Sequence, residues 1–166
     1  MSIISVGYSI DLQAMRQMPE DDANAFYELA IEELSSRRVV STEDREVLKI
    51  CLGLQAPDGI KRDLAVPFRW ICKNIGMPIH TETIVTGVYN LELPTGLLDA
   101  KPPFDFPIGD ENVFMLNRYE ISKELEAFSN SAKEAQTSTL SLQRTAFLKW
   151  LSECNSHRTD LVVIES

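Results

Sequence analysis

Apolar residues recur at helical spacing between Pro19 and Ser36. At 100° per residue they form one arc, which predicts the buried face of an amphipathic helix. The arc contains Ala23, Phe26, Tyr27, Ala30, Ile31 and Leu34. Asp21, Glu28 and Glu32 fall on the opposite side. Proline is favoured at a first helical position, and carboxylates are favoured at the positive end of the helix dipole. The pattern therefore predicts a helix over residues 19–36 with an acidic outer face.

Capping residues and apolar stripes predict further helices along the chain. Ser41 with Asp44, and Asn117 with Glu120, have the spacing of capping boxes. The predicted helices begin near Asp11, Ser41, Pro67, Asn117 and Ser138.

The predicted helix over residues 67–76 has one clear core face. That face is formed by Phe68, Ile71, Cys72 and Ile75. Trp70 does not share it and projects toward the far side, between Arg69 and Lys73. A glycine, Gly76, follows the last periodic residue, as is typical of a helix end.

Runs of β-forming residues predict strands at residues 3–8, 113–116 and 161–164. The last run is four consecutive apolar residues, which is typical of a strand buried on both faces. Residues 82–91 are compatible with either a short helix or a strand. Residues 94–112 form a long, proline-rich irregular segment, and such segments are usually functional or held by their own side chains.

These elements predict one α+β domain over residues 1–166. We expect a small mixed sheet that contains the first and last strands, packed by about five helices. A chain of 166 residues is long enough for one substantial core.

The charge balance narrows the classes of partner. The chain has 25 acidic and 16 basic residues, a net charge of −9. Nucleic acids and anionic membranes attract basic surfaces, so neither is expected as a partner. Six carboxylates and no Lys or Arg lie within residues 19–36. This acidity is compatible with a basic protein partner or with solubility alone.

Targeting signals and cysteine usage predict a cytoplasmic protein. Residues 1–10 lack the basic start of a signal peptide, and no apolar run approaches the length of a membrane span. Cys51, Cys72 and Cys154 are far apart and each lies among apolar residues, which predicts three reduced thiols in the core.

Motifs that carry chemistry are missing from the sequence. It contains no nucleophile elbow, phosphate-binding loop, dinucleotide-binding motif or zinc-protease motif. His80 and Glu82 have the spacing of half a zinc-deaminase site, without the cysteine half. Cys154 and His157 lie near a helix C-terminus, where the dipole raises a thiol's pKa. We therefore predict no catalytic residue, no metal, no cofactor and no enzymatic activity.

Two groups of residues are candidates for partner binding. The first is Glu28, Leu29, Glu32 and Glu33, a mostly acidic surface whose alternative interpretation is a solvated helix face. The second is Arg69, Trp70 and Lys73. Trp beside Arg is common at the centres of protein interfaces, although large aromatic side chains more often lie in the core.

Part of the chain resembles a known family. Residues 6–11 (VGYSID), the helix with Trp70, residues 78–87 and residues 160–164 (DLVVI) resemble the YfbM-like family of small acidic bacterial proteins of unknown function. The turn at residues 106–109 (FPIG) is similar to one in a related uncharacterised bacterial family. The resemblance implies an α+β fold and a bacterial cytosolic setting, and it supplies no active residues. Families of this sort include proteins that look like toxin antidotes.

The sequence therefore predicts a non-catalytic interaction protein, specifically an immunity or antitoxin-type protein that blocks a basic bacterial toxin or effector domain. One alternative is an enzyme that acts on a small polar substrate through carboxylates near residues 94–112, with His80. Another is a homo-oligomeric structural protein, for example a homodimer, that buries Trp70 against its own copy.

Overall fold

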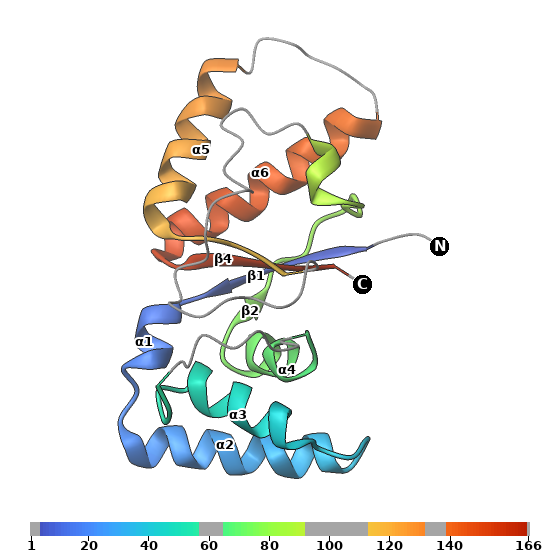
Figure 1. Cartoon of the computed structure of the whole chain (residues 1–166). Helices are drawn as coiled ribbons and strands as arrows, with labels where there is room; N and C mark the ends of the chain where they lie inside the picture. The colour runs from blue at the N-terminus through green and yellow to red at the C-terminus, as the bar shows by residue number, and fades with distance from the viewer. Residues whose placement is uncertain (1–3, 57–64, 92–112, 132–138, 166) are drawn as a thin grey trace.

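A four-stranded sheet crosses the middle of the molecule (Figure 1). The computed structural model describes residues 4–56, 65–91, 113–131 and 139–165. Its strands are β1 (Ser5–Ile10), β2 (Met77–Pro78), β3 (Val113–Leu116) and β4 (Asp160–Glu165), in the order β2-β1-β4-β3.

The α+β class is confirmed, and the sheet contains both the N-terminal and the C-terminal strand as predicted. Every strand pair among the described residues is antiparallel, so the expectation of a mixed sheet is wrong. The reason is that β1 and β3 both pair with β4, which runs between them in the opposite direction. A parallel pair would need a crossover connection between neighbouring strands.

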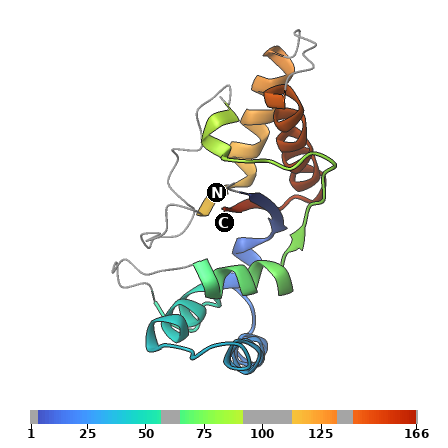
Figure 2. The same ribbon diagram turned by 90° about the vertical axis from the view of Figure 1, so that its right-hand side faces the viewer.

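The two faces of the sheet carry separate hydrophobic cores. Alternate residues of β1 point to opposite faces, so Tyr8 joins one core and Gly7 faces the other. In β4, Val162 belongs to the first core and Val163 to the second. The prediction that β4 is buried on both faces is confirmed, because helices cover both sides of the sheet (Figures 1 and 2).

The first half of the chain supplies one helical layer, drawn below the sheet in Figure 1. Its helices are α1 (Leu12–Arg16), α2 (Glu20–Ser35), α3 (Thr42–Cys51) and α4 (Ala65–Asn74). The predicted capping box of α3 is confirmed, since the Ser41 side chain accepts from the Asp44 N–H and the Asp44 side chain accepts from the Ser41 N–H. Pro19 is the N-cap of α2 and Glu20 is its first helical residue, so the proline lies one position before the one predicted.

The second layer consists of α5 (Arg118–Ser131), α6 (Thr139–His157) and the 3-10 helix η1 (Val88–Leu91). The α6 indole of Trp150 packs directly on the backbone of Gly7. A Cβ atom at Gly7 would lie 2.6 Å from the indole Cδ2. Phe147 meets the Trp150 ring edge-on, with ring centroids 5.7 Å apart. A glycine in β1 is therefore required for α6 to approach the sheet.

Residues 82–91 form neither a regular helix nor a regular strand over their whole length. Val85 makes a single antiparallel bridge with Ser5, and η1 follows. The buried Glu165 carboxylate holds this segment to the sheet, because its Oε1 accepts from the Val88 N–H at 2.7 Å and from the Ser5 hydroxyl at 2.9 Å. The two-residue strand β2 was not predicted, and residues 94–112 lie outside the described part of the chain.

The three cysteines are buried and free, as the sequence predicts. Burial raises the pKa of Cys51 to about 12 and that of Cys154 to about 11. It also raises the pKa of Cys72. These thiols stay protonated at neutral pH, which fits a packing role. In the described part of the chain, no helix has the length and apolar character needed to cross a bilayer.

Candidate binding surface

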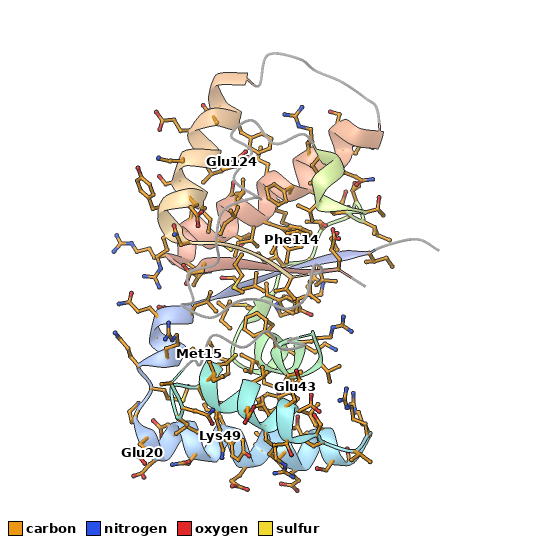
Figure 3. The ribbon with its side chains drawn as sticks, in the orientation of Figure 1. Met15, Glu20, Glu43, Lys49, Phe114 and Glu124 are labelled. Atoms are coloured by element: carbon orange, nitrogen blue, oxygen red, sulfur yellow. The ribbon has the colours of Figure 1, made fainter. Side chains whose placement is uncertain are left out.

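The outer face of α2 is strongly acidic. The helix buries Ala23, Tyr27, Ala30 and Leu34. Its six carboxylates are all exposed, and they are Glu20, Asp21, Asp22, Glu28, Glu32 and Glu33. Figure 3 shows Glu20 on the outside of the molecule, at the start of α2. Leu29 lies among these acids with 42% of its surface exposed.

Only part of this acidity has a structural reason. Glu20, Asp21 and Asp22 occupy the first turn, where negative charge stabilises the helix. Glu28 and Glu32 are four residues apart on the same face, where like charges repel. Glu32 also lies near the negative end of the helix dipole. Neither side chain forms an ion pair with Lys or Arg among the described residues.

Trp70 occupies a different position from the one the sequence predicted. It is 7% exposed and belongs to the same core as Tyr27 and Leu34, so the expectation that it projects away from the core is wrong. The reason is that α2 packs against the side of α4 that the sequence pattern left open. The helix α4 is therefore buried on two sides.

One hydrogen bond joins the two candidate groups. The Trp70 indole N–H donates to Glu33 Oε2 at 2.6 Å. This bond satisfies the one polar atom of a mostly buried side chain. Beside it lies a groove of about 400 Å³. The groove lining includes Glu33, Trp70, Lys73, Arg37 and Asn74.

The members of the second candidate group separate in the structure. Lys73 is exposed and lines the groove beside Trp70. Arg69 is not among the groove residues, and its charge acts instead on the buried Tyr8 hydroxyl. Glu28, Leu29 and Glu32 lie on the outer face of α2, next to the groove through Glu33. The structure therefore brings together an exposed acidic helix face and a groove, with Trp70 as their common support.

A second concave region lies where three strand ends meet, and sequence reasoning missed it. Its volume is about 620 Å³. Asp160, the first residue of β4, accepts a hydrogen bond from the Leu12 N–H at 3.0 Å and another from the Arg118 N–H. The Arg118 guanidinium pairs with Asp11 at 2.6 Å. These residues come from three distant segments, and the only sequence signal was a polar helix cap after each of two strands.

Burial is the main influence on the Asp160 carboxyl. It raises the pKa of Asp160, and the N–H groups of Leu12 and Arg118 and the Arg118 charge oppose that shift. A single buried carboxylate thus caps α1 on one face of the sheet and α5 on the other.

Both histidines line a third, smaller pocket of about 230 Å³ with Lys149 and Glu153. Lys149 Nζ donates to the His80 carbonyl oxygen at 2.9 Å. Cys154 is buried whereas His157 is exposed. Within the described ranges, no cluster of His, Cys, Asp and Glu side chains could hold a metal ion.

The fold and this surface define a class, an antiparallel α/β/α layered protein with an acidic outer helix. Comparison with protein-family models, with curated proteins and with solved structures found no match. The resemblance to the YfbM-like family stays a prediction.

Proposed function

We propose that this protein is a non-catalytic interaction protein of the immunity or antitoxin type, which binds a basic toxin or effector domain through the outer face of α2. The observation that carries the proposal is the exposure of Glu28 and Glu32 around Leu29. Their charges repel each other and contribute nothing favourable to the helix. A basic partner would supply the missing counter-charge.

The dimensions of α2 suit a docking element. A helix of 16 residues is about 24 Å long at 1.5 Å per residue. Leu29 gives this face an apolar contact point, and the carboxylates around it would form charged contacts at the rim. The groove beside Glu33 extends the same surface toward Lys73 and Arg37. Electrostatic attraction would mainly raise the association rate, and added salt would lower it.

The test uses charge reversal with a matched control. Glu28→Lys with Glu32→Lys changes the net charge by four units on the proposed face. Glu82→Lys with Glu126→Lys makes the same change at two exposed positions outside α2. The wild-type protein and both variants are used to isolate a stoichiometric basic partner from the native host, and association rates are measured with the purified partner at several salt concentrations.

We expect the α2 variant to associate at least about tenfold more slowly, since close charge pairs act mainly on the association rate. The control variant is expected to change the rate much less. If the association rate falls equally in both variants, the effect comes from net charge alone, which would contradict a specific interface on α2. Failure to recover any stoichiometric partner would count against the proposal as a whole.

The two alternatives have less support. Trp70 is buried within its own chain, so it is not available to anchor a second copy. The proposed enzymatic carboxylates near residues 94–112 lie outside the described residues, and that alternative stays a prediction.

A further inference from the structure

The concave region at the strand ends follows from the topology of the sheet. β1 and β3 flank β4 and run in the same direction, because each is antiparallel to β4. At their shared end, the chain from β1 enters α1 on one face, and the chain from β3 enters α5 on the other (Figure 1). In open α/β sheets, ligands bind where neighbouring strands send their connections to opposite faces, because the diverging chains open a crevice. In this antiparallel sheet a similar divergence occurs between β1 and β3, the two strands that flank β4.

The crevice is lined by polar side chains from both helical layers. Gln13, Arg16 and Gln17 come from the α1 side, and Asn117, Arg118 and Tyr119 come from the α5 side. Its volume of about 620 Å³ is in the range of ordinary small-molecule sites, roughly 300–1,000 Å³. Nothing in the proposed partner-binding role uses these residues.

The charge of the crevice differs from that of the whole molecule. Two arginines, Arg16 and Arg118, line it together with one acidic residue, Asp160. That carboxylate is buried and already accepts backbone hydrogen bonds from both helix starts. The N-terminal end of α5, a helix of 14 residues, adds partial positive charge. Asp11, which is not among the lining residues, pairs with Arg118, so two arginines and two carboxylates meet at this crevice in a chain of net charge −9.

We propose that this crevice binds a small organic oxyanion, a metabolite that carries a phosphate or a carboxylate group. The oxyanion lies between the guanidinium groups of Arg16 and Arg118, whose planar donors match phosphate and carboxylate oxygens. The carboxamides of Gln13, Gln17 and Asn117 hydrogen-bond the polar body of the ligand. Tyr119, 67% exposed, presents its ring at the rim.

The existing ion pair of Arg118 is compatible with this role. Arg118 pairs with Asp11, and both side chains are about two-fifths exposed, at 42% and 39%. Exposed ion pairs contribute little to stability, so a ligand oxyanion can take over the guanidinium at small cost. The pair holds the guanidinium ordered near the crevice when no ligand is bound.

Arg38 is a control for Arg118 with nearly the same exposure of the arginine. Arg38 is 41% exposed and pairs with Asp44 at 2.8 Å, but it lies outside the crevice. We would compare Arg118→Gln with Arg38→Gln in the full chain. The probes are adenosine monophosphate and citrate, which present a phosphate and carboxylates respectively. Binding is followed by calorimetry and by the thermal midpoint, against sodium chloride of equal ionic strength.

At least one probe is expected to bind the wild type, with Arg118→Gln weakening it about tenfold or more and Arg38→Gln leaving it unchanged. Binding of adenosine monophosphate alone would assign a phosphate ligand, and binding of citrate alone a carboxylate. The proposal is overturned if neither probe exceeds the salt control, or if both arginine variants lose binding equally.

A second measurement keeps the test independent of how Arg118→Gln folds. The side-chain amide signals of Gln13, Gln17 and Asn117 in wild-type NMR spectra should shift on addition of the bound probe. Unshifted amide signals would place the probe elsewhere and overturn the assignment. The variant Glu28→Lys with Glu32→Lys should bind the probe as the wild type does, so failure of this site and failure of the α2 interface are distinguishable.

Discussion

The indole N–H of Trp70 donates to the carboxylate of Glu33 at 2.6 Å, which connects the buried side of α4 to the exposed end of α2. This bond explains why one acid of the outer face is held in place. It also separates Glu33, which supports the fold, from Glu28 and Glu32, which have no such partner among the described residues.

Glu33→Ala is expected to lower the free energy of unfolding by about 1–2 kcal/mol, because it leaves a mostly buried indole N–H without its acceptor. Glu33→Gln keeps an acceptor oxygen and should lower the free energy of unfolding by less. Urea denaturation of the two variants measures the difference. Equal losses, or no loss for alanine, would show that the bond contributes little to stability.

Glu32→Lys is expected to raise the free energy of unfolding by about 0.5–1 kcal/mol. It replaces a repulsive pair with Glu28 by an attractive one and puts a cation near the helix C-terminus. The same change should weaken binding of a basic partner. Urea denaturation at low and high salt checks the electrostatic origin, since salt should reduce the gain. A loss of stability would mean that Glu32 has a structural role.

Gly7→Ala is expected to destabilise the protein by about 1–3 kcal/mol, because the new methyl group would overlap the Trp150 ring. Trp150→Leu removes that overlap but also loses the packing contacts of the indole ring. In a double-mutant cycle the two changes together should cost less than the sum of the single changes. Thermal and urea unfolding supply the four free energies, and simple additivity would contradict the direct contact.

Asp160→Ala is expected to lower the free energy of unfolding by about 2 kcal/mol or more, because one carboxylate caps the starts of both α1 and α5. Far-ultraviolet circular dichroism and urea denaturation would measure the loss. A change near zero would contradict the shared cap.

Asp160 also predicts a dependence of stability on pH. Its folded-state pKa is raised above the ordinary value of 3.8, so the folded state binds this proton more tightly than the unfolded state does. Ionisation of this carboxyl therefore lowers the stability relative to that of its protonated form, and this loss disappears as the pH falls below 3.8. As the pH decreases to below 3.8, the wild type should therefore gain stability relative to the Asp160→Asn variant. Urea denaturation at a series of pH values checks the sign, and a relative loss would show that the carboxylate is favoured in the folded state.

The candidate surface shows where sequence reasoning reaches its limit. The acidic stripe of α2 was predictable, because the exposed face of an isolated amphipathic helix follows from its own periodicity. The burial of Trp70 was not, because it depends on which second helix packs against α4. The crevice at Asp160 was also out of reach, since its residues are brought together only by strand pairing.

The sequence alone therefore determined the local features of this protein. Helical periodicity defined α2 and its acidic face, side-chain to backbone spacing defined the caps at Ser41 and Asn117, and an unbroken apolar run defined β4. Only the tertiary structure decided that Asp160 joins Leu12 and Arg118, and that Trp70 lies in the core. Those contacts link segments far apart along the chain, and their geometry is set by how the helices pack on the two faces of the sheet.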